Sequence, residues 1–284
     1  MLFALAQIPF PHINPTVVQF GPIAIRWYGI AYLTGFLLGY VLLKRMVASG
    51  RLRLTLDQLS DLLGWLVAAV VIGGRLGWWL IYHRTAGPAD PWYTPLAIWQ
   101  GGMSFHGGLV GIVAVLTAWC WWNKYSFWHV ADSMALVAPV GLFFGRIANF
   151  INAELVGRAT NVPWAVVFPG DNFGRHPSQI YEALLEGVVI FLLLWKLARK
   201  GRQSDGTIAG TFVTLYAISR FTLEFTRQPD DQIGFIAFGW LTMGQLLSLL
   251  MLLAGILIIW TRHNAKRHAS PPKHSPFARP NEIH

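Results

Sequence analysis

Residues 238–261 have the sequence FGWLTMGQLLSLLMLLAGILIIWT, which contains no charged side chain. A helix that crosses a bilayer needs about 20 predominantly apolar residues, so this run predicts a transmembrane helix. Six other segments meet the same criterion: 20–43, 57–82, 104–122, 128–151, 178–198 and 207–226. We therefore expect an all-α, polytopic membrane protein with about seven transmembrane helices.

The composition agrees with this expectation. Of the 284 residues, 54% are hydrophobic and only 12% are charged, which is unusual for a soluble domain. The net charge of +9 could suggest nucleic acid, but the basic residues lie in separate clusters between apolar runs. We expect the bilayer, and no nucleic acid, as a partner. The single cysteine, Cys120, lies in an apolar run and predicts a packing residue.

Lysine and arginine collect after the first, third and fifth predicted spans and in the tail. The positive-inside rule makes that side cytoplasmic, so the N-terminus faces outward and the C-terminus inward. Glycines and prolines between the fourth and fifth spans predict a small outward-facing head at 152–176. Residues 1–265 then form one domain, and 266–284 a disordered cytoplasmic tail.

Arginines within the spans or toward the outer side are not explained by topology. An ionised side chain near the centre of a span costs about 2.5 to 3.5 kcal/mol on insertion scales, so it usually faces a cavity or a partner. The arginines of this kind are Arg26, Arg75, Arg84, Arg146, Arg158, Arg175, Arg220 and Arg227.

The fourth span places Arg146, Asn149 and Asn152 at i, i+3 and i+6, on one helical face that can bind an anion. The sixth span carries a second stripe: Tyr216, Arg220, Glu224 and Arg227. Three arginines against one glutamate predict a surplus of positive charge, which suits the phosphate of a phospholipid head group. The alternative is a set of ion pairs between helices with no substrate.

Weaker candidates flank these stripes. His106 lies between glycine pairs at the start of the third span and is a candidate general base, although glycines there also permit tight helix packing. Tyr28 by itself is typical of an interface belt. Gln179, Glu182 and Glu186 share a face of the fifth span and are expected to brace the arginines.

Four motifs occur in order: GGMSFHGGLVG at 101–111, GRIANFINAELVGR at 145–158, HPSQIYEALLEG at 176–187 and YxxxRFxxExxRQPD from Tyr216. Together they resemble the prolipoprotein diacylglyceryl transferases of the bacterial inner membrane, from about Ile25 to Gln245. The resemblance implies transfer of the diacylglyceryl group of phosphatidylglycerol to the lipobox cysteine of a prolipoprotein signal peptide. This reaction, the first step of lipoprotein maturation, forms a thioether, releases glycerol phosphate and needs no cofactor or metal.

The resemblance also implies site residues. The catalytic residues would be His106, Arg146, Arg220 and Glu154. Those binding phosphatidylglycerol would be Arg146, Arg220, Asn149, Tyr28, Tyr216 and Gly157, and the supporting residues would be Glu224, Arg227 and Asn152. Ala148 and Ala153 stand where the family usually has glycine, from which we expect slightly altered packing and no loss of activity.

A membrane transporter or lipid flippase could use the same arginine-rich anion site. Transporters often show two similar halves, whereas each motif occurs once here. No nucleotide-binding glycine loop, metal-ligand helix or serine-nucleophile elbow occurs in the sequence. The run Gly73-Gly74-Arg75-Leu76-Gly77 is interpreted as helix packing.

Overall fold

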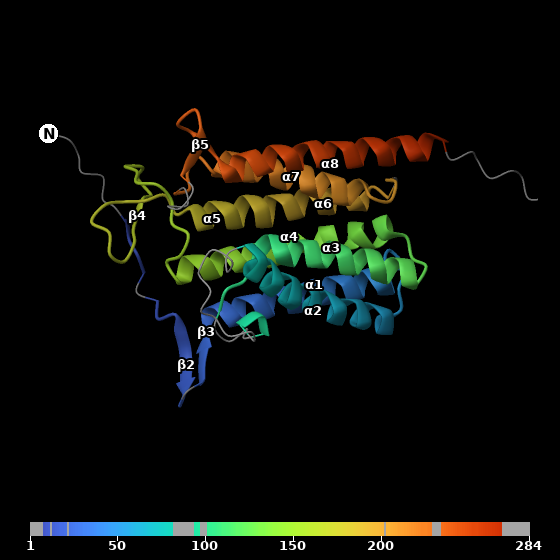
Figure 1. Cartoon of the computed structure of the whole chain (residues 1–284), viewed down its shortest axis with the longest axis horizontal. Helices are drawn as coiled ribbons and strands as arrows, with labels where there is room; N and C mark the ends of the chain where they lie inside the picture. The colour runs from blue at the N-terminus through green and yellow to red at the C-terminus, as the bar shows by residue number, and fades with distance from the viewer. Residues whose placement is uncertain are drawn as a thin grey trace, which may run out of the picture.

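The computed structural model describes residues 8–11, 13–21, 23–81, 94–96, 101–201, 203–228 and 234–268. Long helices lie side by side along one direction, and short strands gather at one end of the bundle (Figure 1). The helices are α1 (Trp27–Ala48), α2 (Leu56–Ile81), α3 (Phe105–Trp122), α4 (Phe127–Ile151), α5 (Ser178–Glu182), α6 (Ile190–Arg199), α7 (Thr207–Leu223) and α8 (Met243–His268). A π-helical segment, η4 (Ala183–Val189), joins α5 to α6, and a 3₁₀ turn, η2, covers Thr94–Leu96.

Five of these helices, among the described residues, are long and apolar enough to cross a membrane: α1, α2, α3, α4 and α8. The chain is therefore a helical, polytopic membrane protein, as predicted. The helix that runs from Ser178 to Arg199 through η4, and α7 with 17 residues, fall outside this set. Both carry buried charged side chains, which are described below.

The short strands were not predicted. They are β1 (Ile8–Pro9), β2 (Thr16–Phe20), β3 (Ile23–Arg26), β4 (Val166–Val167), β5 (Phe235–Ala237) and β6 (Leu241–Thr242). They pair as β1–β4, β2–β3 and β5–β6. The predicted starts of the first and last spans, at 20 and 238, are wrong because the β2–β3 and β5–β6 hairpins occupy those residues. Apolar residues in a hairpin at a membrane surface satisfy the same hydropathy criterion as the start of a helix.

Helix α2 packs against α3 through glycines. A Cβ added to Gly77 would lie 2.6 Å from the Cα of Gly107. A Cβ added to Gly73 would lie 2.5 Å from the carbonyl oxygen of Gly107. Small residues allow two backbones to approach this closely. This confirms the packing interpretation of residues 73–77. Cys120 is also confirmed as a packing residue, because it is buried in the apolar core.

Residues 152–176 contain no helix and are held by backbone pairs instead. Gly157 pairs with Arg227, and Arg175 pairs with both Ala159 and Val166. Strand β4 also pairs with β1 near the N-terminus. Helix α8 ends at His268, and residues 269–284 of the expected tail lie outside the described residues. The segment 152–176 lies beside the end of α4 and the start of α5 (Figure 1).

Candidate active site

Buried glutamates and partly buried arginines meet near the end of the bundle that carries the strands. The arginine–glutamate cluster consists of Arg146, Glu182, Glu186, Arg220, Glu224 and Arg227. Helix α4 supplies Arg146 close to its C-terminal end. Glu182 is the last residue of α5, and Glu186 lies in η4. Arg220 lies in the last turn of α7, and Glu224 and Arg227 follow that helix. Neighbouring antiparallel helices bring these ends together, so residues about 40 positions apart become partners.

Glu182 is the centre of the cluster. Its carboxylate lies 2.7 Å from Nε of Arg146, 3.3 Å from Nη1 of Arg227 and 3.9 Å from Nη1 of Arg220. The residue is 1% exposed, which makes these contacts strong determinants of where the guanidinium groups lie. One carboxylate thus holds three arginines from two different parts of the chain.

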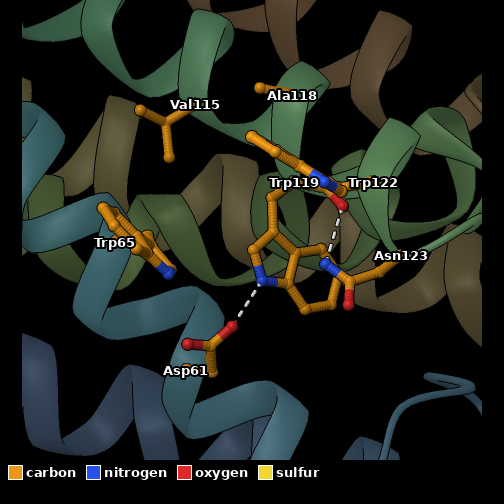
Figure 2. A pocket seen from close by; sticks show the side chains of 7 residues that line it. All are labelled: Asp61, Trp65, Val115, Ala118, Trp119, Trp122 and Asn123. Atoms are coloured by element: carbon orange, nitrogen blue, oxygen red, sulfur yellow. Dashed lines mark hydrogen bonds between the residues drawn. The ribbon is translucent and has the colours of Figure 1, made fainter.

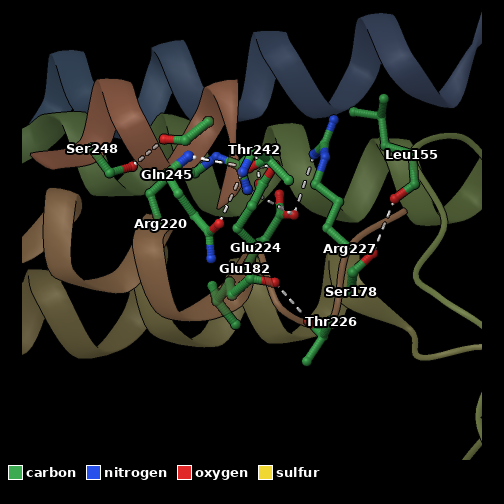
Figure 3. A network of polar contacts seen from close by, with 12 residues as sticks. Leu155, Ser178, Glu182, Arg220, Glu224, Thr226, Arg227, Thr242, Gln245 and Ser248 are labelled. Carbon is green, nitrogen blue, oxygen red and sulfur yellow. Dashed lines mark hydrogen bonds and ion pairs between the residues drawn. The ribbon is translucent and has the colours of Figure 1, made fainter. Parts of the chain in front are cut away.

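Two further glutamates complete the cluster. Glu186 lies 3.3 Å from Nη2 of Arg146, and Glu224 lies 2.7 Å from Nη2 of Arg220. Thr242 donates its hydroxyl to Glu224 at 2.9 Å, as Figure 3 shows. The predicted bracing of the arginines by Glu182 and Glu186 is confirmed, as is the predicted pairing of Arg220 with Glu224.

The predicted surplus of positive charge is wrong. Only Glu224 lies on the arginine stripe, but the fold adds Glu182 and Glu186, so three arginines face three glutamates. Gln179 does not brace an arginine either. Its amide donates instead to the backbone carbonyl of Glu154, at 2.5 Å.

The cluster and two buried glutamines, Gln179 and Gln245, leave hydrogen-bonding groups without a partner. Among the described residues, no hydrogen-bond partner is present for the buried Nη1 of Arg220, Oε1 of Glu186, Oε1 of Gln179 or Nε2 of Gln245. A buried polar group without a partner costs about 1 to 3 kcal/mol, so such groups mark sites where a ligand or water completes the network. The cluster is therefore balanced in charge and incomplete in hydrogen bonds.

A second polar group, next to the cluster, surrounds Glu154. Asn149 and Asn152 each donate a side-chain N–H to its carboxylate, both at 3.3 Å. The hydroxyl of Tyr28 lies 3.1 Å from the hydroxyl of Tyr32, and it is close enough to Asn149 and Glu154 to interact with both. The structure thus brings together Tyr28, Asn149, Asn152 and Glu154, all of them predicted site residues.

The backbone around Glu154 is unusual. Ala153 and Leu155, on either side of it, have φ values of 54° and 56°, in the left-handed region that L side chains rarely adopt. Backbone strain of this kind persists only where the surroundings hold it, and it is common at active sites. The observation also explains why glycine would suit position 153.

Two other predicted site residues are Tyr216, which interacts with the cluster through its side chain, and Gly157, which lies in a backbone pair. Tyr216 is close enough to Arg146 and Glu186 to interact with both electrostatically. Gly157 is buried in the backbone pair with Arg227, and a Cβ there would lie 2.7 Å from the carbonyl oxygen of Thr226. Glycine is required at position 157 because another backbone segment approaches it closely. The sequence did not reveal this contact.

Outside the cluster, Arg158, Arg175 and Arg75 have structural partners. Arg158 donates to the backbone carbonyls of Arg227 and Glu224, at 2.8 and 3.3 Å, and so satisfies acceptors just beyond α7. Arg175 pairs with Asp171 at 2.7 Å. Arg75 donates to backbone carbonyls of the segment before α3. Arg26 is exposed, and Arg84 lies outside the described residues.

His106 lies in the first turn of α3, which begins after Ser104; the hydroxyl of Ser104 accepts a hydrogen bond from the Gly107 N–H at 3.2 Å. The imidazole is exposed. Within the described part of the chain, no hydrogen bond or ion pair joins it to the arginine–glutamate cluster or to Glu154. Its role as a base stays a prediction.

A family profile described as prolipoprotein diacylglyceryl transferase matches residues 15–261, which include all of these groups. The chain belongs to the prolipoprotein diacylglyceryl transferase family. A relative from Rhodospirillum rubrum, named phosphatidylglycerol–prolipoprotein diacylglyceryl transferase, is 49% identical over 277 residues, covering 95% of this chain and 99% of that protein. A protein of the same name from Allorhizobium ampelinum is 47% identical, with coverage of 95% and 96%. The chain is thus a transferase of this family.

Proposed function

We propose that the chain transfers the diacylglyceryl group of phosphatidylglycerol to the thiol of a prolipoprotein cysteine, the first step of lipoprotein maturation. A new S–C bond forms at the glycerol carbon that carries the phosphate, the C–O bond to that phosphate breaks, and glycerol phosphate leaves. The observation that carries this is the incomplete arginine–glutamate cluster in a chain of this family. The transferase names of the relatives favour the enzyme over the transporter or flippase alternative.

Arg146 and Arg220 are the proposed phosphate ligands. Guanidinium donors match phosphate oxygens and offset the charge that develops on the leaving group. Nη1 of Arg220 has no hydrogen-bond partner in the described structure, so it offers the first donor to an incoming phosphate. Tyr28, Tyr216 and Asn149 bind the head group around these donors in this proposal, and Gly157 fixes the adjacent backbone.

Glu182, Glu224 and Arg227 are positioning residues in this proposal. Glu182 holds the guanidinium group of Arg146 from one side, and Glu224 holds that of Arg220. Ion pairs of this kind fix the planes of both donors before the lipid arrives, which lowers the cost of ordering them during binding. Asn152 serves in the same way by holding Glu154.

The acceptor thiol must lose its proton before it attacks, since a free cysteine has a pKa of about 8.5. We propose His106 as the base that takes this proton. Its imidazole is exposed, so an extended peptide has access to it. Glu154 is proposed as a second catalytic group that orients the substrate. Near-native turnover of His106→Gln across the pH range would remove the histidine from the mechanism.

We further propose seven spans in the bacterial inner membrane. The helix from Ser178 to Arg199 runs without a break through η4, and α7 follows it back, which supplies the two additional crossings. Lysines and arginines near the α1–α2, α3–α4 and α6–α7 turns then face the cytoplasm. The N-terminus and the head at 152–176 are periplasmic, and the C-terminus is cytoplasmic. Residues 1–265 form one catalytic domain.

The substrates in this proposal are phosphatidylglycerol and the lipobox cysteine of a signal peptide. The test is mass spectrometry of a lipobox peptide incubated with purified protein and phosphatidylglycerol. We compare the wild type with Arg220→Lys and with a control, Arg175→Lys, which changes an arginine outside the cluster. Diacylglyceryl mass on the cysteine with wild type and control, and at least tenfold less with Arg220→Lys, is expected. No adduct with wild type would refute the proposal.

A further inference from the structure

A groove between α2 and α3, remote from the arginine–glutamate cluster, has a different chemistry. It encloses about 420 Å³ and is lined mainly by indole rings and small apolar side chains. Trp65 comes from α2, and Trp119 and Trp122 come from α3, as Figure 2 shows. Asp61 is the only charged residue among the described residues that line it. The groove is therefore apolar and aromatic, and it carries one carboxylate.

The two oxygens of the Asp61 carboxylate differ in their hydrogen bonding. Its Oδ2 accepts the indole N–H of Trp119 at 2.7 Å, which fixes the side chain at the edge of the groove (Figure 2). Its Oδ1 has no hydrogen-bond partner among the described residues, and the residue is exposed. Trp119 is 6% exposed and rigidly packed, whereas Trp65 and Trp122 are 56% and 78% exposed.

Indole faces and a carboxylate at one site recognise cations. The ring quadrupole of tryptophan attracts an ammonium group, and a carboxylate accepts its N–H donors. The same carboxylate repels phosphatidylglycerol, whose head group carries net negative charge. The ligand should therefore carry an ammonium group with N–H donors and an apolar body.

The position of the groove identifies the source of that ligand. Asp61 lies near the start of α2 and Trp122 at the end of α3, so the groove opens at the end of the bundle opposite the arginine–glutamate cluster. Both helices are apolar enough to span a membrane. In the proposed orientation, this is the depth of the cytoplasmic-leaflet head groups.

We propose that this groove binds the head group of phosphatidylethanolamine from the cytoplasmic leaflet. The ammonium group lies between Oδ1 of Asp61 and the indoles of Trp65 and Trp122, and an acyl chain runs along Val115 and Ala118. This inference uses the orientation given under the proposed function and does not depend on the transfer reaction. It makes the chain a binder of two phospholipid classes at opposite ends of the bundle.

The test is native mass spectrometry of the full-length protein, released from micelles with phosphatidylethanolamine, phosphatidylcholine or phosphatidylglycerol of identical acyl chains. Asp61→Asn keeps an oxygen for the Trp119 N–H, removes the charge and replaces the other oxygen by an NH2 group. Asp57→Asn, one turn earlier on the same helix and outside the groove, is the matched control. Transferase activity, unchanged in both variants, reports an intact fold.

We expect Asp61→Asn to retain phosphatidylethanolamine about fivefold less than the wild type and the control, with no loss in retention of phosphatidylglycerol. The wild type should prefer phosphatidylethanolamine to phosphatidylcholine, which offers no N–H donor. Equal retention of phosphatidylethanolamine by Asp61→Asn and the wild type would overturn the proposal. Loss of both lipids to the same extent in Asp61→Asn would also overturn it, because the charge would then not select the head group.

Discussion

Glu182→Gln tests the cluster most directly, because this variant removes one charge and almost no volume. The wild-type carboxylate contacts Arg146, Arg220 and Arg227 and is 1% exposed. Removing one partner of a buried ion pair costs about 3 to 5 kcal/mol, and glutamine keeps one acceptor oxygen. We therefore expect a loss of about 3 kcal/mol in the free energy of unfolding without lipid.

The effect of lipid distinguishes a phosphate site from a purely structural one. In Glu182→Gln, three arginines face two glutamates, so a bound phosphate restores the missing negative charge. We expect phosphatidylglycerol to bind this variant about tenfold more tightly than the wild type, which corresponds to about 1.4 kcal/mol of additional stabilisation. Turnover should fall, because the donors lose their fixed orientation.

The assay is thermal unfolding of purified protein in detergent, with and without phosphatidylglycerol. Asp171→Asn is the matched control, because it removes a carboxylate paired with Arg175 at 2.7 Å outside the cluster. The stabilisation by lipid should be larger in Glu182→Gln than in the wild type and unchanged in the control. Equal stabilisation in all three proteins would refute the reasoning that the phosphate lies among these arginines.

Three further predictions concern the scaffold. Ala153→Gly should raise the free energy of unfolding by about 1 kcal/mol, because Ala153 has a φ of 54°; an unchanged midpoint would contradict this. Gly107→Ala would place a Cβ 2.8 Å from Gly77 Cα and should lower the thermal midpoint, whereas Gly64→Ala, with open space at its Cβ, should not. Burial lowers the pKa of His176 below 6.5. Stability should then fall as the pH drops below about 6.5, and His176→Asn should flatten that part of the measured profile.

Local sequence patterns predicted which side chains share one face of a helix. Helical spacing placed Arg220 and Glu224 on one face, and the structure pairs them at 2.7 Å. The same spacing put Glu182 and Glu186 on a common face, where both reach Arg146. Periodicity is a property of one segment, so these predictions needed no knowledge of the fold.

Contacts between segments could not be predicted in this way. The balance of charge depends on the packing of α4 and α7 against α5 and η4, which no local pattern encodes. Gly157 is constrained by Thr226, which is distant in sequence. The β2–β3 hairpin was mistaken for the start of a span, because hydropathy measures apolar content and not backbone pairing. The distance from His106 to the reacting atoms also depends on tertiary structure.

The balanced charge of the cluster has a consequence for how substrate binds. Three partly buried guanidinium groups are costly without counter-charges, and Glu182, Glu186 and Glu224 supply them. In the proposed function, a phosphate therefore binds by exchange, because it takes guanidinium donors that carboxylates now occupy. The donor that starts this exchange is Nη1 of Arg220, which lies 3.9 Å from Glu182 and has no hydrogen-bond partner in the described residues. In this proposal, the affinity for the lipid is the difference in free energy between the arginine–phosphate pairs and the arginine–glutamate pairs that they replace. The glutamates stabilise the site when it is empty, and they compete with the phosphate product, which can therefore leave.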